Sequence, residues 1–262
     1  MQNIKAKKMK ILRILEYSMV FLIGMLVALL IFPSFVVENN LTGAVIQEST
    51  VFRTNSIKGV STDIAAVSSL DNSGVLGKLT VEITYGNGKV LINTNPFLEP
   101  DLQYSATIAA DVAQKIAIER LKDKNIIYNF DIAANVLGGG SAGAAMSIAT
   151  ISALLGKELK DNVVITGTIR EDGVIGPVGG LIEKAQAVAE NEKKIFLIPK
   201  GQGILNYYEK EIRQVKRGNF TISRTYYVPK RFDLKKYGKE ELGIEVIEVE
   251  TIYEVMNIML RE

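Results

Sequence analysis

The chain has 262 residues, 47% of them apolar and 23% charged, which is the composition of an ordinary folded protein with one large domain or two small ones. Its net charge of +2 gives no basis for binding nucleic acid, so we expect no such partner. It contains no histidine and no cysteine. A Ser-His-Asp triad, a thiol nucleophile and a Cys/His zinc site are therefore excluded, and we expect neither a metal nor a cofactor.

A long apolar stretch, residues 17–37, lies near the start of the chain and carries no charged side chain. As a helix rising about 1.5 Å per residue it would span roughly 30 Å, the thickness of bilayer hydrocarbon. The segment before it holds five basic residues, Lys5, Lys7, Lys8, Lys10 and Arg13. By the positive-inside rule we predict a cytoplasmic N-terminus (1–16), a transmembrane signal anchor (17–37) and an extracytoplasmic remainder. The alternative is a cleaved signal peptide, after which the same domain would be secreted.

Residues 38–58 are polar with little periodicity and predict a spacer, so the folded domain is expected to cover 59–262. Its first clear pattern is the alternation of Leu79, Val81, Ile83 and Tyr85 with polar residues, which is typical of a half-buried strand. A Gly-Asn-Gly turn at 86–88 and a second apolar run at 89–92 follow. The two runs predict a β-hairpin.

An amphipathic helix is predicted from about Tyr104 to Lys122, because apolar residues recur there every four positions. Extended chain over 126–137 then leads to three consecutive glycines, Gly138 to Gly140. The alanine-rich segment 141–155 predicts a buried helix ended by Gly156, which places Ser141 at a helix N-terminus.

The second half of the chain alternates strands with helices. We predict strands over 162–169, 194–198 and 244–249, a helix over 181–191 and an amphipathic helix after residue 251. Residues 203–240 are rich in charge and tyrosine, have no clean period and predict a surface excursion. Two roles are open for this excursion: covering a site, or contacting a neighbouring subunit in a homo-oligomer.

Ser141 and Lys184 are the candidate nucleophile and base. Without histidine, lysine is the natural base for a serine, but only when burial lowers its pKa from about 10.4 toward about 7–8. Lys184 follows an apolar run, which favours such burial. The ordinary alternatives are a helix cap for Ser141, a solvated charge for Lys184 and a space-filling strand residue for Thr166.

The glycines before Ser141 have two interpretations. The backbone amides of Gly139 and Gly140, together with the helix dipole, are candidates to hold a developing oxyanion. The spacing of Gly138, Gly140 and Gly143 also matches the G-x-G-x-x-G pattern of nucleotide-binding proteins. That pattern needs an acidic residue at the end of the next strand, and 162–169 has none. A Walker A loop is missing as well, because Gly74–Thr80 has the wrong spacing.

These motifs, in this order, resemble the proteolytic domain of Lon proteases, which are Ser-Lys dyad peptidases. Ser141-Ala142-Gly143 is similar to the family's Pro-Ser-Ala-Gly motif, and Thr166–Ile169 to its Thr-Gly-Glu-Ile strand. Gly179–Lys184 resembles the segment with the catalytic lysine, and Phe196–Lys200 the strand after it. The resemblance implies an α+β fold with mixed β-sheets and packed helices.

The resemblance also implies roles for single residues: Ser141 as the nucleophile, Lys184 as the general base and Thr166 as a hydroxyl that orients the lysine amine. The family often has Asp-Gly-Pro before the serine, where this chain has three glycines, so that carboxylate is missing.

The chain also shows no ATPase module. The resemblance is therefore to the small membrane-anchored or secreted Lon-like proteins of archaea. It implies an ATP-independent serine endopeptidase that cleaves peptides or unfolded protein segments. A non-catalytic, anchored binding or assembly module of the same fold is the alternative.

Overall fold

The computed structural model describes residues 57–93, 96–118, 121–133, 136–217 and 220–261. All of them belong to one compact unit, Thr54–Glu262. The predicted N-terminal segment 1–16, the transmembrane helix 17–37 and all but the last two residues of the spacer 38–58 lie outside the described residues. Within the described ranges, no helix has the length and apolar character needed to cross a membrane.

One sheet of the domain has four strands, in the order β1 (Ile57–Val67), β2 (Gly74–Tyr85), β5 (Lys124–Asp131) and β3 (Val90–Ile92). Neighbouring strands are antiparallel except β5 and β3, which are parallel. In β2 the predicted alternation is confirmed, because Leu79, Val81 and Ile83 are fully buried.

The predicted hairpin between β2 and β3 is wrong, because β5 lies between these two strands. The turn at 86–88 packs against the beginning of β5 and does not connect two neighbouring strands. The side-chain oxygen of Asn125 accepts hydrogen bonds from the backbone N–H groups of Asn87 and Lys89, both at 3.0 Å. This side chain satisfies donors that a hairpin partner would otherwise satisfy.

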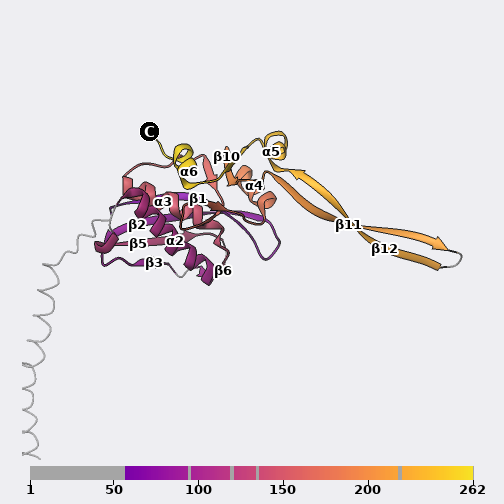
Figure 1. Ribbon diagram of the computed structural model, residues 1–262, viewed down its shortest axis with the longest axis horizontal. Helices are drawn as coiled ribbons and strands as arrows, with labels where there is room; N and C mark the ends of the chain where they lie inside the picture. The colour runs from indigo at the N-terminus through magenta and orange to yellow at the C-terminus, as the bar shows by residue number, and fades with distance from the viewer. Residues whose placement is uncertain (1–56, 94–95, 119–120, 134–135, 218–219, 262) are drawn as a thin grey trace, which may run out of the picture. The chain divides into compact units, whose positions relative to one another are not determined.

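Two helices, α2 (Pro100–Ala117) and α3 (Gly143–Leu155), pack against this sheet and against each other (Figure 1). Helix α2 begins and ends earlier than predicted: Pro100 occupies its first turn, where a missing N–H is tolerated, and the helix stops at Ala117, before Ile118 in the left-handed conformation. Helix α3 is buried over most of its length and ends at Gly156 in the left-handed conformation, as predicted. Its many alanines allow the sheet and α2 to approach closely, and the main core lies between them.

A second sheet is parallel, in the order β13 (Glu245–Val249), β10 (Ile195–Pro199) and β7 (Val163–Ile165). Helix α4 (Leu181–Glu190) packs against β2 and β1 as well as β10, and helix α6 (Ile252–Met259) packs against α3. These positions confirm the predicted helices and the last two predicted strands.

The predicted strand over 162–169 is two strands, β7 and β8 (Thr168–Ile169), and β8 pairs with β9 (Ile175–Gly176). The break lies at Thr166 and Gly167. The backbone N–H of Gly167 donates to the Ser141 carbonyl at 2.9 Å, and its carbonyl accepts from the N–H of Ala144 at 3.0 Å. The chain leaves the sheet here because these backbone groups bind the segment that carries Ser141.

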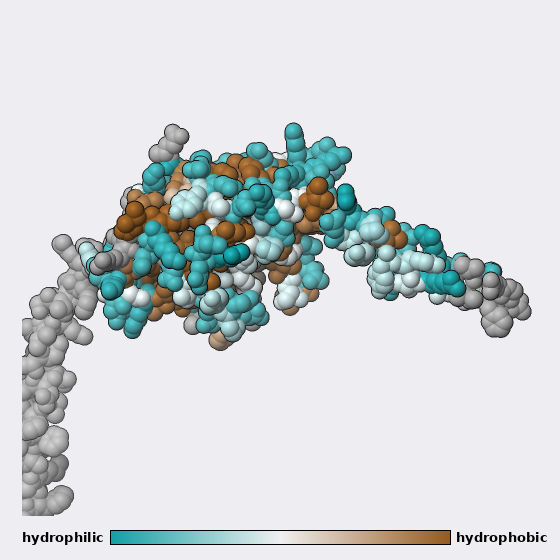
Figure 2. Space-filling model, viewed as in Figure 1, coloured by the Kyte–Doolittle hydropathy of each residue, from teal (hydrophilic) through white to brown (hydrophobic). Residues whose placement is uncertain are grey.

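Residues 203–240 contain a long antiparallel hairpin, β11 (Ile204–Arg217) with β12 (Phe220–Asp233), followed by α5 (Leu234–Tyr237) and a π-helical turn, η3 (Gly238–Leu242). The hairpin extends beyond the two sheets (Figure 1). Its surface is mostly hydrophilic or neutral in hydropathy (Figure 2). Solvent reaches both faces, so the strands lack the apolar alternation that sequence reasoning depends on.

Candidate active site

Ser141 lies in a short 3-10 turn, η2 (Gly140–Ala142), between the two-residue strand β6 (Val136–Leu137) and helix α3. It therefore precedes α3, which begins at Gly143, instead of beginning the helix as predicted. The next residue after the turn packs very closely: a Cβ atom added to Gly143 would lie 2.8 Å from Ile169 Cγ2 and 3.0 Å from the Ile169 backbone nitrogen. Only glycine allows this approach, which fixes the serine turn against β8.

Lys184 lies in the first turn of α4, and only 4% of its surface is exposed. Burial lowers the pKa of its amine from 10.5 to about 8, because desolvation disfavours the ammonium form. Among the described residues, no carboxylate forms an ion pair with this amine to oppose the effect. The neutral amine is therefore a minority form near pH 7 and reaches about half at pH 8.

Thr166 connects the lysine to the serine turn. The Lys184 amine donates a hydrogen bond to Thr166 Oγ1 at 3.2 Å, and this hydroxyl in turn donates to the Ser141 carbonyl at 3.4 Å. Thr166 itself is 1% exposed. With one N–H bound to Thr166, the neutral amine keeps a lone pair that can accept another proton.

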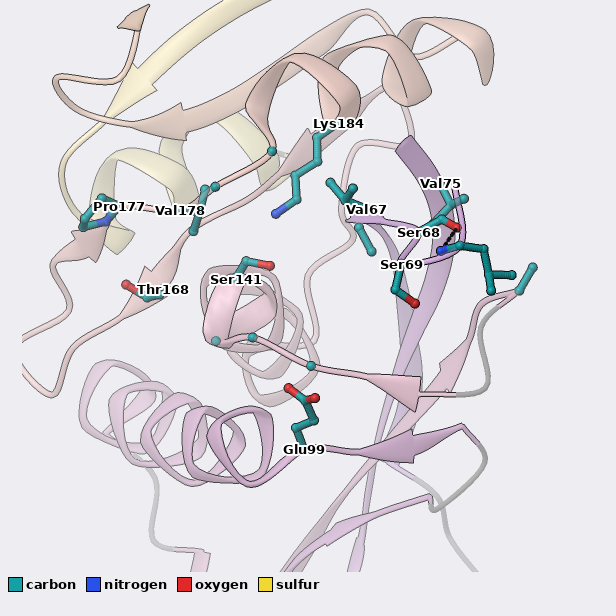
Figure 3. Close-up of a pocket in the computed structure, with 18 residues that line it drawn as sticks. Val67, Ser68, Ser69, Val75, Glu99, Ser141, Thr168, Pro177, Val178 and Lys184 are labelled. Atoms are coloured by element: carbon teal, nitrogen blue, oxygen red, sulfur yellow. Dashed lines mark hydrogen bonds between the residues drawn. The ribbon is translucent and has the colours of Figure 1, made fainter. Parts of the chain in front are cut away.

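Ser141 and Lys184 line one cavity of about 820 Å³. In Figure 3 the amine of Lys184 points from α4 into this cavity, toward the turn that carries Ser141. Gly139 and Gly140 line the same cavity, and Gly139 has a φ of +77°, which glycine adopts without strain. The structure thus brings together the site residues predicted from the sequence.

Sequence reasoning missed several lining residues. They come from the end of β1 and the loop after it, from the segment before α2, from β8 and from the loop before α4, and include Val67, Ser68, Glu99, Thr168 and Val178. Glu99 follows strand β4 (Phe97–Leu98), which pairs in parallel with β6. The two strands place the residues that follow them side by side, namely Glu99 and Gly138. No local pattern around Glu99 indicates this pairing.

The topology does not favour the nucleotide-binding interpretation. Strand β6 pairs with β4, whereas β7, the strand after α3, belongs to the parallel sheet with β10 and β13. The two strands that flank α3 are therefore not neighbours in one parallel sheet, as a dinucleotide-binding unit requires. Gly74–Thr80, the other glycine-containing candidate, lies within strand β2. Within the described part of the chain, no group of three or more acidic side chains could hold a metal ion.

The comparisons with known proteins agree with this geometry. Residues 39–217 match the family model described as the Lon protease (S16) C-terminal proteolytic domain. The chain is 33% identical over 127 residues to the Lon protease of Buchnera aphidicola subsp. Acyrthosiphon pisum. The aligned region covers 46% of this chain and 16% of that protein. Over 143 residues it is 31% identical to the Lon protease of Mycoplasma pneumoniae, covering 51% of this chain and 18% of that protein.

A third relative is the Archaeal Lon protease of Methanocaldococcus jannaschii, 31% identical over 112 residues, which covers 39% of this chain and 17% of that protein. The chain thus spans less than a fifth of the length of these three relatives. The family model, in contrast, covers more than half of the chain and includes Ser141, Thr166 and Lys184. The chain belongs to the family of the Lon protease C-terminal proteolytic domain.

Proposed function

We propose that this protein is a serine endopeptidase that cleaves peptides or unfolded protein segments without ATP, through a Ser141–Lys184 dyad. One observation carries the proposal. The Lys184 amine is buried, has a pKa of about 8, and is held by Thr166 beside the cavity that Ser141 also lines. Family membership supports a serine-type peptidase independently of this geometry.

In the proposed reaction, the neutral Lys184 amine takes the proton of the Ser141 hydroxyl as its oxygen attacks a peptide carbonyl. The backbone amides of Gly139 and Gly140 then stabilise the oxyanion of the tetrahedral intermediate. The ammonium of Lys184 gives its proton to the leaving amine, and an acyl-enzyme remains on Ser141. Water repeats these steps on the ester and restores the free hydroxyl.

The proposed substrate class is supported by one feature of the described residues. Gly74–Thr80 is a paired β-strand and not a phosphate-binding loop. An unstructured peptide can reach the cavity without prior unfolding, whereas a folded protein would first need to be opened. We therefore expect activity on flexible chains in the absence of ATP, and no gain when ATP is added.

The test compares the wild-type protein with Ser141→Ala on a set of unstructured peptides, together with labelling by an active-site serine reagent and peptide mapping. We expect cleavage by the wild type alone and modification at Ser141. Equal cleavage by both proteins, or cleavage by neither across the set, would favour the alternative of a non-catalytic binding module. If the label maps to another serine, that residue and not Ser141 is the nucleophile.

We also propose that the domain lies outside the cytoplasm, anchored by residues 17–37. The support is the charge-free apolar stretch of bilayer length preceded by five basic residues. The test is digestion of intact cells with an added protease, followed by detection of an epitope at the C-terminus. Loss of the epitope from intact cells supports the proposal, and its survival until the membrane is opened contradicts it.

We propose that β11 and β12 mediate self-association. Tyr208, Ile212 and Tyr227 share one face of this hairpin by its pairing register and are 72%, 59% and 66% exposed. On the opposite face the Arg213 guanidinium lies 5.2 Å from the ring centre of Tyr226. Residues 204–233 hold seven basic and three acidic side chains, while the remainder of 54–262 holds 18 basic and 23 acidic ones. This asymmetry favours a second copy as the partner.

Sedimentation analysis of the wild type and of a variant with 206–231 replaced by a short glycine-serine turn tests this self-association. We expect an oligomer for the first protein and a monomer for the second, with the oligomer weakening at high salt. A monomeric wild type would refute self-association. An oligomer that survives the deletion would assign the interface to another surface.

A further inference from the structure

Among the described residues that line the cavity around Ser141, two have ionisable side chains, Lys184 and Glu99. Its other lining residues are glycines, small hydroxyl residues and apolar residues such as Val67, Val75 and Val178. The Lys184 amine must be neutral to act as a base. The charged side chain of the active cavity is then the Glu99 carboxylate. The proposed mechanism does not use this carboxylate.

Glu99 occupies the space that a side chain at position 138 would take. A Cβ atom added to Gly138 would overlap the Glu99 carboxylate. This contact follows from the parallel pairing of β4 with β6, in which Leu98 is opposite Leu137. In Figure 3 the carboxylate points toward the glycine loop that leads into Ser141. The family often carries an aspartate three residues before the serine, and here a glutamate from a different segment takes that place.

The fold itself makes no use of this carboxylate. Glu99 is the N-cap residue of α2, but its side chain forms no capping hydrogen bond. The nearby amide of Gln103 donates to the Leu98 carbonyl, and the Leu102 N–H is bound by the carboxylate of Asp101. Among the described residues, Glu99 has no ion pair or hydrogen bond through its side chain. It is also exposed, so a ligand can reach it.

The charge of Glu99 limits what it can bind. A carboxylate beside the place where an oxyanion develops would disfavour that anion, unless a cation neutralises the carboxylate. The lowered pKa of the Lys184 amine is caused by burial and does not require Glu99. The fitting ligand is therefore a positively charged group of the substrate. A carboxylate binds lysine ammonium or arginine guanidinium through charge-assisted hydrogen bonds.

We propose that Glu99 is a specificity-determining residue that binds a lysine or arginine side chain of the substrate close to the scissile bond. The proposal rests on the peptidase function proposed above and identifies a substrate class for it. The preference should appear mainly in KM, because the ion pair forms already in the bound substrate. It should also weaken with rising salt.

The first test uses unstructured peptides that differ at one position near the cleaved bond, with lysine in one and norleucine, its uncharged analogue, in the other. We expect the wild type to prefer the lysine peptide by roughly tenfold in kcat/KM, as for a hydrogen bond to a charged group. Glu99→Gln should cleave both peptides alike. Asp101→Asn, two residues further along the chain but not among the residues that line the cavity, is the matched control and should keep the preference.

A second test moves the carboxylate from one chain segment to the other. Gly138→Asp alone forces two carboxylates into one space, so it should lower kcat/KM for both peptides. Glu99→Ala alone should remove the lysine preference. Glu99→Ala combined with Gly138→Asp should restore it, because the new side chain enters the space that Glu99 leaves. A double variant without any preference, despite an unchanged melting temperature, would overturn the assignment.

Peptide binding to Ser141→Ala, followed by fluorescence anisotropy, separates this proposal from the peptidase function. Tighter binding of the lysine peptide, lost on adding Glu99→Gln, supports the subsite even if no peptide is cleaved by the wild type. Equal binding of the two peptides, or equal cleavage by an active wild type, overturns the proposal for Glu99 and leaves the peptidase function intact.

Discussion

The amine of Lys184 donates a hydrogen bond to the hydroxyl of Thr166 at 3.2 Å, and both side chains are almost completely removed from solvent. Thr166 is the first residue after β7 and Lys184 lies in the first turn of α4, so the two meet only because the helix packs over the end of the strand. The contact holds the amine while leaving its lone pair available.

Removal of the amine should abolish turnover. We expect Lys184→Met to lower kcat roughly 10³-fold or more, since the base is lost while the apolar stem still fills its space. Lys194→Met, which changes an exposed lysine, is the control and should be as active as the wild type. Peptide hydrolysis measures the effect, and circular dichroism verifies the fold. A rate for Lys184→Met close to that of the control would rule out this lysine as the base.

Thr166→Val should reduce kcat without unfolding the domain. The substitution keeps the shape but removes the hydroxyl that binds the Lys184 amine and the Ser141 carbonyl. A lost hydrogen bond of this kind costs about 1–3 kcal/mol, which corresponds to roughly 5- to 150-fold in rate if it is needed in the transition state. Thr166→Ser should recover most of the activity. Full activity of the valine variant would show that the hydroxyl is dispensable.

Activity should rise with pH through about 8. The pKa of Lys184 is lowered to about 8 by burial. Only the neutral amine, which predominates above this pH, can take the serine proton. The profile of kcat/KM against pH should therefore fall as pH decreases below 8. An activity that stays constant from pH 9 down to pH 4 contradicts a lysine base.

The same burial should destabilise the protein below pH 8. Between about pH 8 and 10.5 the unfolded chain binds more protons at Lys184 than the folded chain, so the free energy of unfolding rises with pH in this window. The difference between 10.5 and about 8 corresponds to a penalty on the order of 3 kcal/mol at lower pH. Lys184→Met should be the more stable protein at pH 7, and this advantage should shrink toward pH 10.5 in denaturant titrations.

Gly143→Ala should disturb the serine turn more than the fold. A methyl group there meets Ile169 at 2.8 Å, so the turn must move away from β8, at a cost of about 1–3 kcal/mol. We expect a large loss of peptidase activity. Gly156→Ala, at the other end of α3, has a φ of +64° and open space around it, and should lower stability by about 1 kcal/mol with little effect on activity. Equal activity of the two variants would contradict the importance of this contact.

Sequence patterns predicted the elements whose burial follows a simple period. The alternation in β2 and the stripe of α6 correspond to observed elements, because side chains on one face were forced into the core, and the alanine-rich α3 does so because it is apolar on all sides and buried. The same reasoning failed for the pairing of β3, which depends on where β5 inserts, and for the hairpin of β11 and β12, whose faces are both exposed. Periodicity carries no information about strand order or about strands without a buried face.

The sequence by itself determined the chemistry that is possible. A chain with no histidine or cysteine leaves serine and lysine as the pair for covalent catalysis, and their motifs indicated Ser141, Thr166 and Lys184. Only the tertiary structure decided whether this chemistry has a place to occur. Burial of an amine depends on everything packed around it, and Glu99 reaches the glycine loop only through the pairing of β4 with β6. Both are properties of distant segments brought together, so no local pattern could have contained them.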